Sequence, residues 1–513
     1  MEIPRNRLPL WSGAACLFWA LAAWFTVIPD GDRLADEIQV QQVLRDPQLV
    51  LAFPGQTHGG VLEYPVLLLA EWMAPGNYFV HAFPRVMFAF LTGFFAARLF
   101  LRLFPTAPRW GFLAAVVAGP AVMHGLTGPE GNAIGVMWLH ANYPQSWLLV
   151  TIGLSLLADE VARTKRPRWW WLLMSGALIG LGVYEQSSVL LLAVPMVIVL
   201  MFAFPQRFSV WVVAASGSLA GALLMVASFL LHFRESVYNP AHAPIPSIAA
   251  SLRVVGLDGI PTFREAILPA GLGFAPLNDS FLRPLAAIIV PLLVAVAVVT
   301  FAIAALRSWR ARKTLPAFLL SGAWLTSIAM MSLMSWLLGT LWFYGGGLGV
   351  LLWITVGALP MIRPRALGMS LTIAAVVLMA YSTLQQTVYW YRDAPAHVAA
   401  KVDRMAEMQA VADELADAGA TTIFGSYWDI MPIAYSSGGR LNPSAIYYDR
   451  FPLDDSSPES VEVFTNVLPT EYHGDDSLAL VREKCTSEGV TVDVSPYLFE
   501  KFSCPLEVVS PRR

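Results

Sequence analysis

Charged residues are scarce in this chain of 513 residues: Asp, Glu, Lys and Arg together make up 13% of it, whereas 56% of its residues are hydrophobic. Soluble globular domains hold about 25% charged and about 45–50% apolar residues. The composition therefore excludes an ordinary soluble protein and predicts a membrane protein. The formal net charge is only −3 at pH 7, so no nucleic-acid partner is expected.

Several common site motifs are also missing. No HExxH or CxxC spacing occurs, so no structural zinc site is expected. The run Gly345-Gly346-Gly347 has neither the spacing nor the lysine of a phosphate-binding loop. No internal repeat is found, which disfavours a transporter built from repeated halves. The first apolar run has no small-residue cleavage site and is too long for a removed signal peptide.

Long apolar runs are what the sequence does contain. A transmembrane helix needs about 20 residues, and about eleven runs of suitable length are predicted to span: 8–28, 79–104, 110–125, 144–159, 168–184, 187–205, 209–232, 283–306, 315–338, 341–361 and 366–389. Lys and Arg follow every second run, which places those loops on the cytoplasmic side. The loops 29–78, 126–143 and 233–282 are then predicted to lie outside.

The C-terminal residues 390–513 have a different composition. They hold 20 of the 36 acidic residues and 10 of the 33 basic residues, and helical and strand patterns alternate along them. We therefore predict a polytopic all-α membrane domain at 1–389, followed by a soluble extracytoplasmic α/β domain at 390–513. Cys485 and Cys504 lie in this exported domain, where disulfides persist, and are predicted to be bonded.

Four carboxylates follow the first predicted span: Asp30, Asp32, Asp36 and Glu37 lie within eight positions. Acids at a membrane boundary are solvated, paired or bound to a cation, so a cluster there favours a cavity or a substrate site. The alternative is an interfacial loop whose acids only face water. The same loop is predicted to contain two short interfacial helices, the second of which starts at Tyr64-Pro65.

The other outer loops supply further candidates. Residues of the second loop and of the turn before the sixth span are typical of sugar sites: Glu130, His140, Asn142 and Glu185. The third loop carries outward arginines, contrary to the positive-inside trend, and guanidinium groups bind phosphate oxygens in pairs. The phosphates available at a membrane are those of its lipids. Three arginines of this loop are therefore predicted to bind a lipid phosphate: Arg234, Arg264 and Arg283. Ordinary headgroup contact or pairing with nearby glutamates is the alternative.

The acidic first loop, its two interfacial helices, the many spans and the outer C-terminal domain resemble the GT-C superfamily of membrane glycosyltransferases. This group includes protein O-mannosyltransferases, the aminoarabinose transferase of lipid A and mycobacterial arabinosyltransferases. Ala35-Asp36-Glu37 resembles the Asp-Glu pair after the first span in the mannosyl- and aminoarabinose-transferase branch, and Glu63-Tyr64-Pro65 resembles its Tyr-Pro. Asp30-Gly31-Asp32 resembles the modified DxD of other branches, so two acid sets remain open.

The resemblance implies a polyprenyl-phosphate sugar donor, an acceptor glycan, lipid or protein of the cell envelope, and inversion at the anomeric carbon. Asp36 is then the general base, and Glu37 or Glu130 assists it or holds a divalent cation. Asp30 and Asp32 are the candidate ligands of that cation, Mg²⁺ or Mn²⁺. Tyr64, His140, Asn142 and Glu185 would bind sugar or acceptor.

The predicted location is the plasma (inner) membrane of a bacterium, with the active site outside. The alternative function is a flippase, transporter, polymerase or ligase of lipid-linked saccharides. Ionisable residues gather at the predicted outer ends of the spans while the span centres are nearly free of them. That distribution favours chemistry at the membrane surface over passage through the membrane.

Overall fold

The structure is a computed structural model that describes residues 3–26, 31–45, 60–119, 143–163, 166–186, 189–204, 206–232, 345–362, 364–391, 394–425, 427–445, 459–466, 476–495 and 497–509, with residues 47, 50 and 51. The chain forms two compact units. The first comprises Met1–Phe25, Arg85–Leu224 and Pro244–Asp393, and the second comprises Thr26–Pro84, Met225–Ala243 and Ala394–Arg513. The predicted division at residue 389 stays a prediction.

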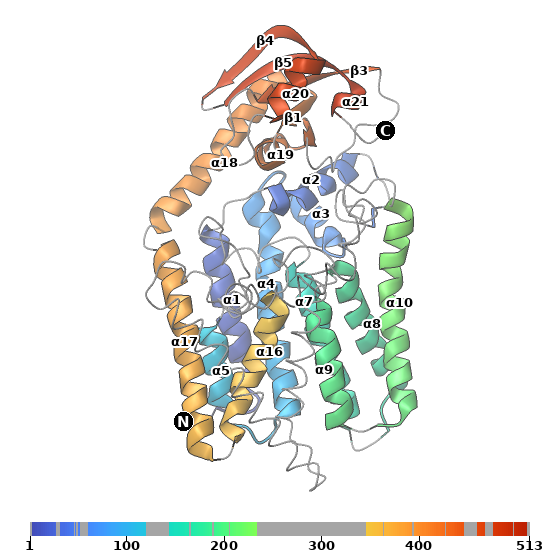
Figure 1. Cartoon of the computed structure of the whole chain (residues 1–513), viewed down its shortest axis with the longest axis vertical. Coiled ribbons are helices and arrows are strands. Elements are labelled where there is room, and N and C mark those ends of the chain that lie inside the picture. The colour runs from blue at the N-terminus through green and yellow to red at the C-terminus, as the bar shows by residue number, and fades with distance from the viewer. Residues whose placement is uncertain are drawn as a thin grey trace, which may run out of the picture. The chain divides into compact units, whose positions relative to one another are not determined.

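Helices make up the first unit (Figure 1), and α4 and α10 each continue into the second unit. The bounds are α1 Leu8–Thr26, α4 Tyr78–Leu103, α5 Arg109–Ala118, α7 Tyr143–Val161, α8 Trp169–Glu185, α9 Leu190–Ala203, α10 Phe208–His232, α16 Gly345–Ala358, the 3-10 turn Leu359–Met361 and α17 Arg365–Tyr391. Every α-helix among these coincides with a predicted span. The spans predicted at 283–306 and 315–338 lie outside the described residues, so the total of about eleven stays a prediction.

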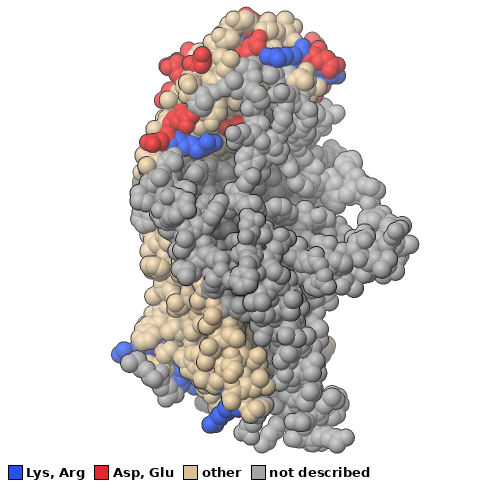
Figure 2. Space-filling model, turned by 60° about the vertical axis from the view of Figure 1, so that its left-hand side comes forward, with Lys and Arg blue, Asp and Glu red and all other residues tan. Residues whose placement is uncertain are grey.

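The surface of these helices suits a membrane. Two helical segments among the described residues, Tyr78–Leu103 and Phe208–Ser228, are long and apolar enough to cross one. The second exposes large apolar side chains along its length, including Phe208, Leu219 and Leu223. On the face shown in Figure 2, the described helices carry a wide uncharged band bordered at one end by Lys and Arg. Such a surface is stable against lipid and unstable in water.

Glycines set the packing of α8 against α10. Gly176 and Gly180 are four positions apart on α8, and Gly217 and Gly221 have the same spacing on α10. A methyl group added to Gly180 would lie 2.0 Å from the backbone oxygen of Ser218, so the two backbones are nearly in contact. Small residues at this spacing are a common way for membrane helices to pack closely.

The second unit joins two helices of the first predicted loop to the C-terminal residues (Figure 1). Its elements are α2 Gly31–Arg45, α3 Tyr64–Met73, α18 Ala394–Asp417, β1 Thr422–Gly425, α19 Tyr427–Ser436, β2 Asn442–Ala445, β3 Ser460–Asn466, α20 Asp476–Lys484, β4 Thr486–Val494, β5 Tyr497–Pro505 and α21 Leu506–Val509. The sheet order is β2-β1-β3-β5-β4. Strand β1 is parallel to β2 and β3, and β5 is antiparallel to β3 and β4. The α/β organisation predicted for the C-terminal residues is confirmed.

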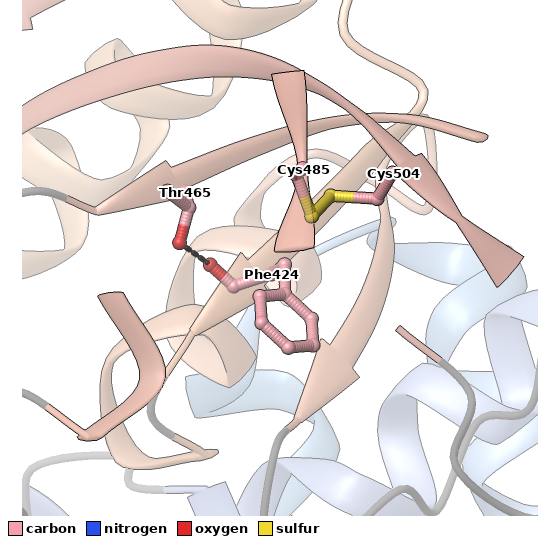
Figure 3. The surroundings of a disulfide bond; sticks show 4 residues. All are labelled: Phe424, Thr465, Cys485 and Cys504. Carbon is pink, nitrogen blue, oxygen red and sulfur yellow. Dashed lines mark hydrogen bonds between the residues drawn. A yellow bond between two sulfur atoms is a disulfide. The ribbon is translucent and has the colours of Figure 1, made fainter. Parts of the chain in front are cut away.

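The disulfide predicted between Cys485 and Cys504 is present, and it joins the residue after α20 to β5 (Figure 3). Cys504 belongs to the apolar core of the sheet with Phe424 and Phe502. In the same region the Thr465 hydroxyl donates a hydrogen bond of 2.9 Å to the backbone oxygen of Phe424, which ties β3 to β1. The α/β part is therefore held by a core and by a covalent link.

Candidate active site

Helix α2 buries the two carboxylates that the sequence singled out. Its apolar residues Leu34, Ala35 and Ile38 are buried, and α2 packs against both α3 and α19. Between those residues in sequence, Asp36 and Glu37 are 0% and 1% exposed. The two acids therefore do not simply face water. Buried carboxylates are costly and mark functional or tightly paired positions.

Tyr64 links α3 to the first of these acids. Helix α3 starts at Tyr64 because Pro65 occupies the first turn, where its missing N–H costs no hydrogen bond. The Tyr64 hydroxyl lies 3.3 Å from Oδ1 of Asp36 and shares its proton with the side-chain oxygen of Gln39. The structure thus brings together Asp36 and Tyr64, two residues that the sequence placed in the same loop without pairing them.

Burial raises the pKa of Tyr64 well above its usual value of about 10, and the negative charges of Asp36 and Glu63 raise it further. Tyr64 therefore stays a neutral hydrogen-bond donor at any physiological pH. Glu63 immediately precedes α3 and is 2% exposed. We call Asp36, Glu37, Glu63 and Tyr64 the acid cluster; it places three carboxylates around one phenol.

A metal ion in this region stays a prediction. Among the residues that the structure describes, no three His, Cys, Asp or Glu side chains are arranged to hold a metal ion. Asp30 and the side chain of Asp32, the proposed metal ligands, lie outside those residues. The choice between the Asp36 set and the Asp30-Asp32 set is therefore left to experiment.

Helix α3 has two different faces. The buried face consists of Tyr64, Leu67, Ala70 and Glu71. The exposed face is apolar, with Val66, Leu69, Trp72 and Met73 between 38% and 75% exposed. An amphipathic helix with a Trp on its exposed apolar face is typical of helices that lie in the membrane interface. Helix α3, whose Tyr64 hydrogen-bonds to Asp36, thus has the surface expected of the interfacial helix that was predicted there.

Glu185, a predicted sugar-binding residue, lies in the first unit. It ends α8 and is fully buried, and the side-chain nitrogen of Gln145 on α7 lies 3.2 Å from its Oε2. The side chains of Tyr143 and Tyr184 are also buried at these helix ends. The other predicted site residues lie outside the described part of the chain: Glu130, His140, Asn142, Arg234, Arg264 and Arg283.

Sequence reasoning missed several buried ionisable residues, and three of them lie on α3 and α4: Glu71, His81 and Arg85. Each is 6% exposed or less and lies inside an apolar run, where it was counted as part of a helix. The signal that could have found them is their chemistry, because ionisable residues inside apolar helices are rare and usually functional. His81 and Arg85 are also four positions apart and so share a helix face.

The chain is thus a mostly helical protein with a C-terminal α/β sheet and a buried acid cluster on two short helices. No protein-family model matches it. It resembles two crystal structures of ArnT from Cupriavidus metallidurans, each at 12% sequence identity over 97% of this chain. The structure bound to undecaprenyl phosphate gives a TM-score of 0.45 and is covered to 99%; the apo structure gives 0.48 and 98%. ArnT is an aminoarabinose transferase of the GT-C class, the group that the sequence motifs resemble.

Proposed function

We propose that this protein is an inverting glycosyltransferase of the plasma membrane of a bacterium. It moves a sugar from a polyprenyl-phosphate donor to a glycan, lipid or protein of the cell envelope, on the outer face. The observation that carries the proposal is the acid cluster: Asp36 is fully buried and hydrogen-bonded by Tyr64, with Glu37 and Glu63 beside it. Acids that only anchored a loop or only faced water at the end of a span would not need to be buried and hydrogen-bonded in this way.

Asp36 acts as the general base in this proposal. It takes the proton of the acceptor hydroxyl while that oxygen attacks the anomeric carbon, which typically accelerates a reaction about 10²–10⁴-fold. The bond from that carbon to the phosphate oxygen breaks at the same time, and polyprenyl phosphate leaves with the electron pair. Attack from the face opposite the leaving group inverts the anomeric centre. Tyr64, held neutral by burial, keeps the Asp36 carboxylate oriented.

The neighbouring acids support the same step. Positive charge develops on the sugar ring as its bond to phosphate weakens, and the charges of Glu37 and Glu63 favour that state. Negative charge develops on the leaving phosphate and needs cationic partners, for which Arg234, Arg264 and Arg283 remain the proposed residues. Glu130, or a divalent cation at Asp30 and Asp32, would complete this part of the site.

The membrane surface explains why the donor is proposed to be lipid-linked. The exposed apolar face of α3 fits the interface between lipid and water, and Tyr64 and Glu71 lie on the other face of the same helix. Chemistry at that depth reaches the phosphate of a membrane lipid. The basic residues that follow the helices, such as Arg102 at the end of α4, support the orientation with α4 entering from outside.

The test is release of polyprenyl phosphate by the purified full-length protein from a panel of lipid-linked sugars. We expect Asp36→Asn to abolish release and Asp403→Asn, which changes an exposed acid on α18, to leave it unchanged. Asp32→Asn is run beside them: if it alone abolishes release, the base belongs to the Asp30-Asp32 set. If the wild type releases nothing from any donor but moves lipid-linked sugar across a vesicle membrane, the transferase proposal is wrong and the flippase alternative stands.

A further inference from the structure

Tyr435, on α19 of the C-terminal part, forms hydrogen bonds with two helices. One is α2, which carries part of the acid cluster, and the other is α4, which follows the loop that carries the cluster. Its backbone oxygen accepts a hydrogen bond of 3.3 Å from the side-chain nitrogen of Gln41 on α2. Its hydroxyl lies 2.7 Å from Nδ1 of His81, at the start of α4. All of these residues belong to the second unit, and Tyr435 is fully buried.

His81 passes the connection on to α3. Its Nε2 lies 2.9 Å from Oε2 of Glu71 and 3.0 Å from the backbone oxygen of Ala74, and both of these atoms are acceptors. The proton of a neutral His81 therefore sits on Nε2, and Nδ1 accepts the proton of the Tyr435 hydroxyl. Glu71 is fixed in turn by the backbone N–H of Gly76, at 3.1 Å from its Oε2.

The two ends of this arrangement are the two helices of the acid cluster. Asp36 is on α2, five residues before Gln41, and its hydrogen-bond donor Tyr64 is on α3, seven residues before Glu71. The contact between Asp36 and Tyr64 needs α2 and α3 to hold one relative position. Arg45 adds a second link from α2, because its guanidinium donates to the backbone oxygen of Gly438 at 2.5 Å.

Burial makes the arrangement restrictive. Tyr435, His81 and Glu71 are 0%, 1% and 6% exposed, so water offers little replacement for a lost partner. The rings of Tyr435 and His81 also meet edge to face, with centroids 5.8 Å apart. Buried hydrogen bonds of this kind favour one geometry, because a displaced member would leave its partner without a replacement.

We propose that Tyr435 and His81 are positioning residues for the acid cluster, through which the C-terminal α/β part sets the relative position of α2 and α3. The inference rests on the proposed glycosyltransferase function for its kinetic readout, although its structural readout is independent of that function. It assigns the C-terminal residues a part in the reaction geometry. A misplacement of about 1 Å at a reacting centre costs about 10²-fold in rate.

Tyr435→Phe is the decisive variant because it removes only the hydroxyl and keeps the backbone oxygen that Gln41 uses. We expect kcat to fall about 10- to 100-fold with little change in the KM for the donor. Amide hydrogen exchange in residues 31–45 and 64–73 should become faster, while the protein stays folded with only a modest fall in melting temperature. Tyr497→Phe, which removes a hydroxyl from β5, is the matched control and should behave as the wild type.

His81 gives the rescue test. His81→Gln retains one donor for Glu71 and one acceptor for Tyr435, so it should recover much of the kcat that His81→Ala loses. The inference is overturned if Tyr435→Phe changes neither kcat nor hydrogen exchange, or if His81→Gln is as impaired as His81→Ala in a folded protein. A wild type without transferase activity would overturn the proposed function instead, and hydrogen exchange in Tyr435→Phe would still decide this inference.

Discussion

The close packing of α8 against α10 predicts a large effect from one added methyl group. In Gly180→Ala the new carbon would lie 2.0 Å from the backbone oxygen of Ser218, whereas ordinary contact begins near 3.4 Å. The helices would have to separate locally by about 1.4 Å, the difference between those two distances. Overpacking of this kind costs about 1–3 kcal/mol, and opening the interface also removes contacts at Gly176 and Gly217.

The matched control is Gly111→Ala on α5, which makes the same substitution where the nearest atom is the end of a side chain that has to give by only a few tenths of an ångström. Its new methyl would meet Cγ2 of Thr372 at 3.3 Å and nothing closer. Replacing Gly by Ala in a helix adds about 0.8–1 kcal/mol of helix propensity, so Gly111→Ala should be neutral or stabilising. Gly180→Ala should be destabilising despite the same propensity gain.

Thermal unfolding of the purified protein in detergent measures both variants. We expect Gly180→Ala to unfold at a clearly lower temperature than the wild type and Gly111→Ala to unfold at the same or a higher temperature. The double variant Gly180→Ala with Gly217→Ala should lose less than the sum of the single losses, because the first methyl has already separated the helices. Equal stability of Gly180→Ala and Gly111→Ala would refute the close-packing argument.

Two further predictions concern Tyr64 and the disulfide. Tyr64→Phe removes a hydrogen bond to a charged group, worth about 1.5–3 kcal/mol, so kcat should fall roughly 10- to 100-fold; an unchanged rate would show that the bond does not serve the reaction. Since the pKa of Tyr64 is raised on folding, its contribution to stability is complete below pH 10 and is lost as the pH rises above it. The phenylalanine variant should lack this alkaline component of unfolding. Reducing the Cys485–Cys504 bond, which closes a loop with a sequence separation of 19, should lower the free energy of unfolding by about 3 kcal/mol; the same reductant should not affect a variant with serine at both positions.

The helices of the first unit could be predicted because length and apolar composition alone decide them. A run of about 20 apolar residues is stable in a membrane only as a helix, since its backbone groups must bond to one another. The bounds of α1, α4 and α10 accordingly match the predicted spans to within two residues. The start of α3 at Tyr64-Pro65 was also predictable, because proline is favoured in a first turn and disfavoured later in a helix.

Helix α19 was not predicted, although it contributes Tyr435. It contains Pro432 and begins with Tyr427-Trp428, which the sequence presents only as an aromatic pair beside Asp429. A helix of 10 residues has little stability of its own. Its buried residues, Ile430, Met431, Ile433 and Ala434, are stabilised by packing against α2, α18 and the sheet. That packing depends on residues far away in the chain and leaves no local signal.

The acid cluster was predictable in part. The sequence identified Asp36, Glu37 and Tyr64 as members of one outer loop, because acidic residues next to a span and a Tyr-Pro helix start are visible locally. Glu63 was seen only as part of that motif. The hydrogen bond between Asp36 and Tyr64 joins residues 28 positions apart, and the bond between His81 and Tyr435 joins residues 354 apart. The separation of two residues along the sequence does not show how close they lie in the structure, so neither bond could be predicted.

The sequence by itself determined the apolar helices, the α/β character of the C-terminal residues, and the residue types of the candidate site, because composition and short-range periodicity fix these locally. Tertiary structure alone decided which acids are buried, which phenol bonds Asp36, and that Tyr435 on the C-terminal helix α19 touches both Gln41 and His81. Those facts depend on how distant segments pack, and burial then sets the charge and hydrogen bonding of each group. The chemistry proposed for this protein rests on both levels.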